Sequence, residues 1–480
     1  MEFAYRFRPV SRLIGPEGVG GELDELYIFF AAPEQLNDPL EGYKDVFFRG
    51  DSIVWENLVR HYVRCLINEV FLFLSRNLDE APSRDVGVFA NSQNCTSHFN
   101  ELHEKAYNRL IDEPILLKYI QQCLAGKRKM RRWELINHLS TLHPYALEEV
   151  FIAMHAEQLL PEVPEYLTAH RGARLAQTQK LVEKMSTAVD DEIYAELFKS
   201  VYRISEQYKI ITRLGAADHE EKESWFHLLF EFPECYCLSL DRLIHPAWYT
   251  ACFMASCSDS SIWGTYGGNH RDVCLKFKID QDEDGRSLNL RSPSGCGMEG
   301  IIHRKERVPL YDVCYEKEFI EIDFFQSLGH LSRKQLMDTW YQGRDGTISL
   351  CAEEMLKDPE LWRKKYWEEF YHATTVKLKA WNREQESRLI LSSTINDLSD
   401  PDVRKLKYDF NSLDGIIFGI NTSTSDKVKI IKKIKELCAL HKRADFNFYQ
   451  ASYDQGQRSI SYDRMAFIKA GCSAVEDEKR

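Results

Sequence analysis

The sequence predicts an α+β protein in which both ends of the chain build one mixed sheet and the middle forms a large all-helical insertion. Short strand-like runs lie near the start of the chain, and further ones return after residue 233. Between them, apolar residues recur every four positions over a long stretch, which is the period of an amphipathic helix. We expect a core from 1–52 and 233–470, a helical insertion at 53–232 and a tail at 471–480.

Composition and charge narrow the class of protein. A chain of 480 residues exceeds what one hydrophobic core usually serves, and 44% hydrophobic with 28% charged residues is typical of a folded globular protein. The net charge of -12 argues against a global field for nucleic acid. The basic cluster Lys127 to Arg132 (KRKMRR) is expected to be a solvated helix face or loop.

The cysteines and the first residues predict a cytoplasmic protein without a membrane partner. The 13 cysteines form no CxxC pair, so we expect reduced, mostly buried thiols. The opening residues MEFAYRFRPV contain no apolar stretch of the kind that forms a secretory signal.

The N-terminal part of the core combines two strands with a turn-rich loop. Residues 3–7 (FAYRF) and Leu26 to Ala31 (LYIFFA) have strand propensity. The loop that follows presents three polar side chains together, Asn37, Asp38 and Glu41. Two interpretations remain open, a ligand-binding loop and a plain Asx-type turn.

Within the insertion, helices are expected near 100–124, 131–142, 145–159 and 170–212. The histidines there show no HExxH or other metal-ligand spacing. We therefore expect them to be structural or exposed.

The second part of the core begins with strands at Glu234 to Leu240, Ala251 to Cys257 and Val273 to Ile279. Ser258 is predicted to cap a short helix that carries Trp263 and Tyr266, which are three apart and share a face. These aromatic rings either fill the core or stack against a flat ring at a cleft, and the sequence leaves both interpretations open.

The remaining C-terminal segments are expected to be a loop, further strands and a crossover. Asp280 to Gly285 imitates the start of a calcium loop, but Arg291 stands where a bidentate glutamate is needed, so calcium is excluded. The segment on to Gly300 reads as a lid-like loop. Leu413 to Gly419, a helix over 426–441 and a strand over 445–453 predict a parallel crossover, with the helix capped by Thr424 or Ser425.

The segment Val376 to Leu391 (VKLKAWNREQESRLIL) carries the main candidate site. Glu384 and Glu386 are two apart, and on an extended segment their side chains share a face. Two like charges held that close need a compensating cation, proton or cationic substrate. The alternative is an exposed strand edge in which these glutamates pair with Arg383 and Arg388.

Several motifs taken together resemble a known family. The order YRF, LYIFFAAPEQLNDPLEG, CFMASCSDSSIWGTYGGNHRDVCLKF, VCYEKE, KAWNREQESRLIL and DGIIFG resembles the bacterial domain of unknown function 2971 family. The resemblance covers about 1–50 and 235–455 and leaves out the helical insertion. It implies no settled activity.

The motif order is also similar, more weakly, to that of ADP-ribosyltransferases, with a late ExE glutamate. This similarity implies that Glu386 stabilises the oxocarbenium-like centre formed as nicotinamide leaves NAD, while Glu384 orients the acceptor. It implies NAD contacts from the loop, the early strand and the aromatic element: Tyr5, Arg6, Arg8, Asn37, Asp38, Trp263 and Tyr266. The acceptor would be a protein or a nucleic acid, as for a bacterial toxin or defence effector.

Two other functions stay open. Asp38, Glu41, Glu384 and Glu386 would be Mg²⁺ ligands if the chain were a phosphodiesterase or nuclease. Alternatively, the chain is a non-enzymatic sensor whose helical insertion binds a partner protein.

Overall fold

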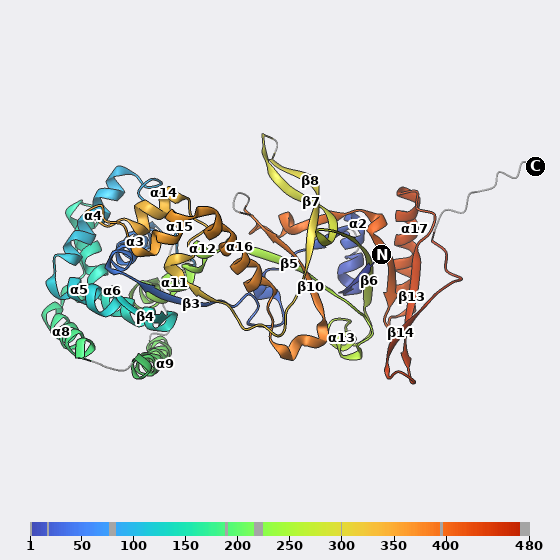
Figure 1. Ribbon diagram of the computed structural model, residues 1–480, viewed down its shortest axis with the longest axis horizontal. Helices are drawn as coiled ribbons and strands as arrows, with labels where there is room; N and C mark the ends of the chain where they lie inside the picture. Colours follow the sequence, from blue (N-terminus) through green and yellow to red (C-terminus); the bar gives the residue numbers. More distant parts are fainter. Residues whose placement is uncertain are drawn as a thin grey trace, which may run out of the picture. The chain divides into compact units, whose positions relative to one another are not determined.

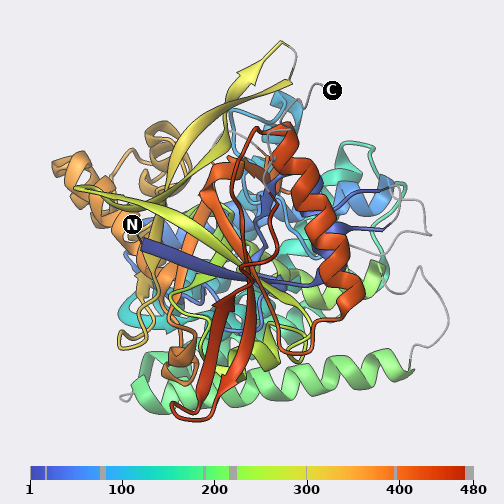
Figure 2. The same cartoon turned by 90° about the vertical axis from the view of Figure 1, so that its right-hand side faces the viewer.

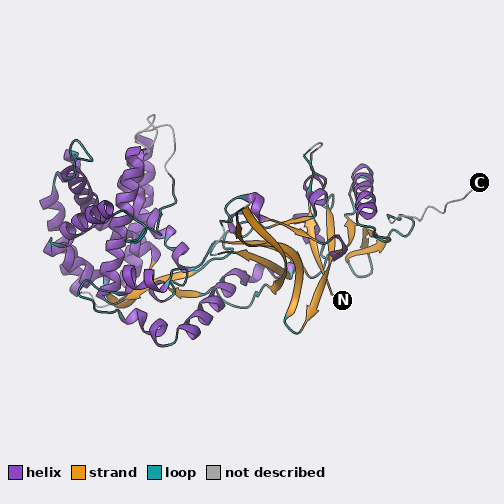
Figure 3. Cartoon of the chain, turned by 90° about the horizontal axis from the view of Figure 1, so that it is seen from above, coloured by secondary structure: helices purple, strands orange, loops and turns teal. Residues whose placement is uncertain are grey.

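The chain divides into two compact units. The computed structural model describes residues 2–16, 19–75, 83–187, 191–215, 224–298, 300–393 and 397–470, so the tail predicted at 471–480 lies outside it. The barrel unit comprises Met1–Tyr43, Ala247–Phe319 and Tyr371–Arg480, and the helical unit comprises Lys44–Pro246 and Ile320–Phe370. Strands dominate the first and helices the second, so the α+β class is confirmed (Figures 1 and 3). The helical unit includes 320–370, which the sequence analysis assigns to the core.

The sheet of the barrel unit closes on itself. Its order is β14-β13-β12-β6-β1-β5-β10-β8-β7-β11-β2, and an added β6–β7 pairing joins six of these strands into a ring. Neighbours within this ring are all antiparallel. The prediction of a mixed sheet is therefore corrected to a closed, barrel-like sheet. The strands of this unit are β1 (Glu2–Arg8), β2 (Tyr27–Phe29), β5 (Trp248–Met254), β6 (Val273–Asp282), β7 (Gly285–Gly297), β8 (Gly300–Asp312), β10 (Glu386–Ser392), β11 (Lys405–Tyr408), β12 (Leu413–Phe418), β13 (Asn447–Asp454) and β14 (Ser459–Arg464).

The length of β6 explains the closure. Its first seven residues pair with β1, from Val273 opposite Arg8 to Ile279 opposite Glu2. Its last three residues, Asp280–Asp282, pair instead with β7. One strand therefore has partners that lie far apart in the strand order, and the sheet must curl to satisfy both.

The parallel crossover predicted near the C-terminus is confirmed, and it lies outside the ring. Strands β12 and β13 pair in parallel through α17 (Thr424–Leu440). The helix lies beside these strands (Figures 1 and 2), and its Ile430 and Ile434 join the same buried cluster as Phe418 and Phe448. The N-cap is Ser423, whose hydroxyl accepts from the backbone N–H of Asp426, instead of the predicted Thr424 or Ser425.

Two secondary-structure predictions in the second half are wrong. The segment expected to be a lid-like loop up to Gly300 forms the long hairpin of β7 and β8, which pair from Ser287 opposite Pro309 onward. The segment Glu234 to Leu240, expected to be a strand, lies mostly in helix α11 (Phe232–Ser239). Pro233 lies in the first turn of this helix, a position that suits proline because its missing N–H leaves no helical hydrogen bond unmade there.

Smaller helices complete the barrel unit: α1 (Val10–Ile14), α2 (Glu22–Glu25), η1 (Pro33–Gln35), α13 (Ser260–Thr265), η7 (Lys379–Glu384), η8 (Pro401–Arg404) and η9 (Phe410–Ser412). The N-cap of α13 is Asp259, one residue after the predicted Ser258. Its carboxylate accepts the backbone N–H groups of Ser261 and Ile262.

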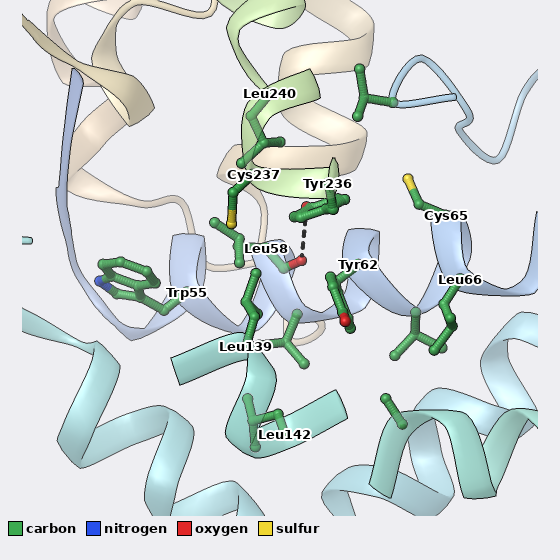
Figure 4. Packing of buried hydrophobic residues seen from close by; sticks show 14 of the residues in the cluster. Trp55, Leu58, Tyr62, Cys65, Leu66, Leu139, Leu142, Tyr236, Cys237 and Leu240 are labelled. Atoms are coloured by element: carbon green, nitrogen blue, oxygen red, sulfur yellow. Dashed lines mark hydrogen bonds between the residues drawn. The ribbon is translucent and has the colours of Figure 1, made fainter. Parts of the chain in front are cut away.

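The helical unit packs its helices around one apolar cluster. Helix α3 (Ser52–Ser75) carries the four-residue apolar period, and its buried face meets α6 (Arg132–Ala156) and α11. Figure 4 shows this contact, with residues of the cluster labelled: Trp55, Leu58, Tyr62, Leu66, Leu139, Leu142, Tyr236 and Leu240. The helices predicted over 131–142 and 145–159 are the single helix α6, with Pro144 inside it.

Further elements of this unit are α4 (Ser97–Ile111), α5 (Pro114–Tyr119), η2 (Ile120–Leu124), α7 (Glu165–Thr168), α8 (Arg171–Thr187), α9 (Asp191–Gly215), η3 (His227–Glu231), α12 (Asp241–Ile244), η4 (Phe324–Gln326), α14 (Arg333–Leu336), η5 (Met337–Tyr341), η6 (Leu350–Ala352), α15 (Glu353–Lys357) and α16 (Pro359–Thr375), which continues past the unit's boundary. Within the described residues, no helix has the length and apolar character needed to cross a membrane.

A small sheet also lies in the helical unit, with the order β4 (Gly126–Arg131), β3 (Asp45–Gly50) and β9 (Glu321–Asp323). Most of the KRKMRR cluster therefore lies in a strand, not in a helix face or loop. Lys129 and Arg131 both form ion pairs with Glu321.

Candidate functional site

A cavity of about 250 Å³ lies in the barrel unit, against strands β1, β5 and β10 and the loop after β2. Its polar lining consists of Tyr5, Arg6, Arg8, Arg12, Gln35, Asn37, Glu41, Thr250, Tyr266, Lys377, Glu384 and Glu386. Polar side chains thus converge on the cavity from segments that are far apart in the sequence.

The two ExE glutamates reach this cavity by a route that the sequence analysis did not predict. Glu384 ends the 3₁₀ helix η7, Gln385 adopts a left-handed conformation with φ of 43°, and Glu386 begins β10. The premise of one extended segment is therefore wrong. Both carboxylates nevertheless contact the same amine, since Lys377 Nζ lies 2.7 Å from Glu384 and 3.2 Å from Glu386.

Arg388 connects Glu386 to a third carboxylate, that of Glu41. Its buried guanidinium donates through Nε to Glu386 at 2.8 Å, through Nη2 to Glu41 at 2.6 Å and through Nη1 to the carbonyl of Thr374 at 2.8 Å. Glu41 also lies 3.0 Å from the amine of Lys377. These side chains are buried, so the predicted exposure of this strand edge is wrong, although the pairing of Glu386 with Arg388 that the same interpretation expected is present.

The ion-paired cluster carries unequal charges. Three carboxylates, Glu41, Glu384 and Glu386, face two cations, Lys377 and Arg388, so the fully ionised cluster has one excess negative charge. Buried charge is costly unless it is paired, so an uncompensated carboxylate favours a proton or a cationic ligand. The cavity beside the cluster provides room for such a ligand.

The two ExE glutamates differ in their affinity for protons. Burial acts to raise the pKa of Glu386, but the charges of Arg388 and Lys377 outweigh it and lower the pKa to about 2. Burial raises the pKa of Glu384 above its usual value, although Lys377 and the donating hydroxyl of Tyr266 oppose this shift. Glu386 therefore stays ionised at neutral pH, and Glu384 is the carboxylate better suited to take up a proton.

Arginines line the cavity from β1 and α1. The buried guanidinium of Arg6 donates to the carbonyls of Cys252 and Phe29, both at 3.0 Å. Burial lowers its pKa to about 10, so it remains a cation at neutral pH. Arg8 pairs with Glu22, whereas no described carboxylate pairs with the exposed Arg12. The arginines thus reach the cavity from β1 and α1, whereas Glu384 and Glu386 reach it from η7 and β10, with β5 between β1 and β10 in the strand order.

Most of the predicted site residues lie together. Seven of them line the cavity: Tyr5, Arg6, Arg8, Asn37, Tyr266, Glu384 and Glu386. The NDP loop and the ExE segment thus face one cavity, as expected, but through Asn37 and Glu41. The roles assigned to these residues stay predictions.

Asp38 and Trp263 do not line the cavity, in contrast to the prediction for both. The buried carboxylate of Asp38 accepts the backbone N–H of Leu40 at 3.0 Å, which is an Asx-type turn. Trp263 is fully buried, donates its indole N–H to Cys257 at 2.7 Å and packs edge-on against Phe7. Of the two aromatic residues, Trp263 therefore fills the core and Tyr266 faces the cavity.

Lys377 is the central residue that sequence reasoning missed. In the sequence it differs little from Lys379, which is exposed and pairs with Glu316. The sequence carries no signal that separates the two lysines; only in the structure does the ring of Trp381 lie 4.8 Å from the amine of Lys377. Sequence reasoning also missed Arg12 and Tyr315, whose hydroxyl accepts the backbone N–H of Glu386 at 2.9 Å.

The arrangement does not favour the magnesium site. Among the residues that the structure describes, no three His, Cys, Asp or Glu side chains are grouped so that they could hold a metal ion. Lys377 and Arg388 contact the carboxylates of Glu41 and Glu386 that were expected as ligands, and Asp38 caps a turn.

Comparison with known proteins adds no relative: the chain matches no family model, no curated protein and no solved structure. The resemblances described for the sequence therefore stay predictions.

Proposed function

We propose that the cavity binds NAD and that the chain is an ADP-ribosyltransferase-like enzyme that modifies a protein or a nucleic acid. One observation carries this proposal: the lining of a single cavity combines three arginines with a buried cluster that has an excess negative charge. NAD carries an anionic pyrophosphate and a cationic pyridinium ring, so the arginines and the carboxylate cluster each have a complementary group on it. We also propose a cytoplasmic location, where NAD is available.

The size of the cavity bears on how NAD would bind. At about 250 Å³ it is smaller than the roughly 300–1,000 Å³ typical of sites that enclose a drug-sized ligand. We therefore expect it to hold the nicotinamide and its ribose, with Tyr266 and Asn37 beside them. The exposed Arg12 and its neighbour Arg8 would contact the pyrophosphate.

The two glutamates would divide the chemistry between them. In the transfer, the bond from the ribose to nicotinamide breaks, nicotinamide leaves with the electron pair, and an acceptor oxygen or nitrogen bonds to the same carbon and loses a proton. Glu386, which stays ionised at neutral pH, would stabilise the positive charge that develops on the ribose. Glu384, with its raised pKa, would accept the proton of the acceptor.

Incubation with NAD labelled on its adenylate phosphate, together with a cell lysate, tests the proposal. We expect label on a macromolecule, and digestion with protease or nuclease identifies its class. Glu386→Gln should abolish labelling, whereas Glu316→Gln, an exposed carboxylate of the same unit, should leave it unchanged. A wild-type protein that neither labels a macromolecule nor releases nicotinamide would overturn the proposal.

A further inference from the structure

Lys377 lies at the centre of the ion-paired cluster, and its amine has a carboxylate for each of its N–H groups. The amine donates to Glu384 at 2.7 Å and to Glu386 at 3.2 Å, and Glu41 lies 3.0 Å away. A protonated amine has three N–H donors and no acceptor. The number of donors therefore equals the number of carboxylates around the amine, so no donor is left for a substrate.

The backbone and the side chain of Lys377 are both held in place. Its backbone N–H donates to the carbonyl of Cys314 at 3.2 Å, and the N–H of Cys314 donates to the carbonyl of Thr375 at 2.8 Å. The side chain is 4% exposed, and the ring of Trp381 lies 4.8 Å from the amine. Burial acts to lower the pKa of Lys377, but the carboxylates outweigh it and raise the pKa above its usual value. The amine therefore keeps its protons at neutral pH.

Glu384 depends on Lys377 more than the other two carboxylates do. Glu386 and Glu41 also pair with Arg388, at 2.8 and 2.6 Å. Glu384 has no second cation among the residues that the structure describes. Without Lys377, Glu386 would keep a cation, whereas Glu384 would lose the one it has.

We propose that Lys377 is a positioning residue of this site: its amine aims the carboxylates of Glu384 and Glu386 into the cavity and does not itself donate to the ligand. The inference rests on the proposed transfer, in which these two carboxylates divide the chemistry. Lys377 acts mainly on the step assigned to Glu384, the uptake of the acceptor's proton, because that carboxylate has no other cation among the described residues.

Removal of the amine tests this role. Lys377→Ala should lower transfer to the acceptor by about 100-fold, the typical cost of a group misplaced by about 1 Å. NAD hydrolysis should fall less, because Arg388 still holds Glu386. Lys379→Ala is the matched control, since Lys379 is 71% exposed, and it should leave both rates unchanged. Equal losses of transfer and hydrolysis in Lys377→Ala would overturn the proposal.

Replacement of the missing atoms separates the N–H donors of the amine from its charge. Lys377→Ala lacks the carbons beyond Cβ and the amine, which are the heavy atoms of propylammonium, and this ion can enter from the cavity that Lys377 lines. Propylammonium should restore transfer in the variant as its concentration rises. Tetramethylammonium, a cation without N–H donors, should not. Rescue by both cations, or by neither, contradicts a role that depends on N–H donors.

Thermal unfolding detects the same contacts without any activity. Propylammonium should raise the melting temperature of Lys377→Ala as its concentration increases, as a ligand of the folded state does, and should leave that of the wild type unchanged. Absence of this rise would refute the role of Lys377. A wild type that neither labels a macromolecule nor releases nicotinamide, together with the rise in the variant, would overturn the transferase alone and support the amine contacts.

A second variant keeps the test decisive if Lys377→Ala does not fold. Lys377→Ala combined with Glu41→Gln leaves the carboxylates of Glu384 and Glu386 with Arg388, so the excess stays at one negative charge, as in the wild type. It should show the same loss of transfer and the same response to propylammonium. A double variant with normal transfer would rule out the positioning role.

Discussion

Two groups of buried polar side chains in this molecule differ in whether their hydrogen-bonding and charged partners balance. In the helical unit, His61 contacts the hydroxyl of Tyr236 at 2.8 Å and the carbonyl of Val88 at 2.9 Å. His143 contacts the hydroxyl of Tyr62 and the carbonyl of Leu228, both at 2.7 Å. Burial lowers the pKa of His61 to about 3 and of His143 to about 4, so both rings are neutral at neutral pH.

In the barrel unit, the second group consists of charged side chains, three carboxylates and two cations, and it lies beside a cavity. Among the residues that the structure describes, Glu41, Glu384 and Glu386 form ion pairs with two cations, Lys377 and Arg388. A neutral imidazole between a hydroxyl and a carbonyl is complete and needs nothing more. The carboxylate cluster is incomplete by one charge. The difference teaches that the balance of partners, more than the presence of titratable residues, separates a structural polar group from a candidate site.

The largest expected effect comes from removing the central cation. Arg388→Met leaves Glu41 and Glu386 buried with Lys377 alone, and breaking a buried ion pair in this way typically costs about 3–5 kcal/mol. Urea denaturation, with hydrogen exchange of β10 as a local probe, measures the loss. Arg12→Met, at an exposed arginine of the same cavity, should change the free energy of unfolding by less than about 0.5 kcal/mol. Equal stability of the two variants would contradict the importance of the ion pairs.

The second largest effect is expected on NAD turnover, and it distinguishes a catalytic role of Glu386 from a structural one. Glu386→Gln leaves two carboxylates for two cations, so the protein should fold, while NAD turnover should fall by about 100-fold to 1,000-fold. Glu384→Gln should reduce transfer to the acceptor more than NAD hydrolysis. Turnover and thermal unfolding are measured on the same samples. A folded, fully active Glu386→Gln protein would end the transferase hypothesis.

Acid should destabilise the helical unit at a higher pH than the barrel unit. A histidine whose folded pKa is depressed contributes stability that is present above pH 6.5 and is lost as the pH falls, by about 1.4 kcal/mol per pH unit for each ring. Arg64 and His103 near His61, and His227 near His143, further oppose protonation.

Glu386 behaves differently, because its pKa falls from 4.5 to about 2, so its contribution is kept above pH 4.5 and is lost only below that. Hydrogen exchange at pH 6.5 and 4.5, corrected for intrinsic rates, should show α3 and α6 losing protection before β5 and β10. If β10 lost protection before α3 and α6, the predicted difference in acid sensitivity between the two units would be wrong.

The smallest effect is expected at Tyr266. Its hydroxyl donates to Glu384 and lowers the pKa of that carboxylate, so Tyr266→Phe should raise this pKa further. Losing one such hydrogen bond costs about 1 kcal/mol. The acid limb of the pH profile for transfer should therefore move to higher pH. Tyr5→Phe, which removes a hydroxyl bonded to Tyr462 at 2.9 Å, should leave that limb in place.

Much of the local structure followed from sequence periodicity, whereas long-range pairing did not. The β12–α17–β13 crossover was predictable because a buried apolar run, an amphipathic helix and a second strand follow in order. The segment ECYCLSL was not, since a short apolar run fits either a strand or a buried helix such as α11. Closure of the ring was also beyond reach, because it depends on three residue pairs between β6 and β7.

The candidate site shows the same division. Glu384, Glu386 and the polar loop were identified because carboxylates close together in sequence are conspicuous. Lys377 was missed because tertiary contacts alone distinguish it from Lys379. The excess charge of the cluster could be counted only after the structure had placed Lys377 and the carboxylates in contact with one another.

The pairing of β1 has a consequence for how the chain folds as it is made. Arg8 in β1 pairs with Val273 in β6, roughly 265 residues later. At synthesis rates of about 5–20 residues per second, β1 waits roughly 15 to 50 s for this partner. During that time its alternating apolar side chains and unpaired backbone groups form an open edge that can associate with other chains. The barrel unit therefore forms late, and a nascent chain is most vulnerable to aggregation while its helical segments are being translated.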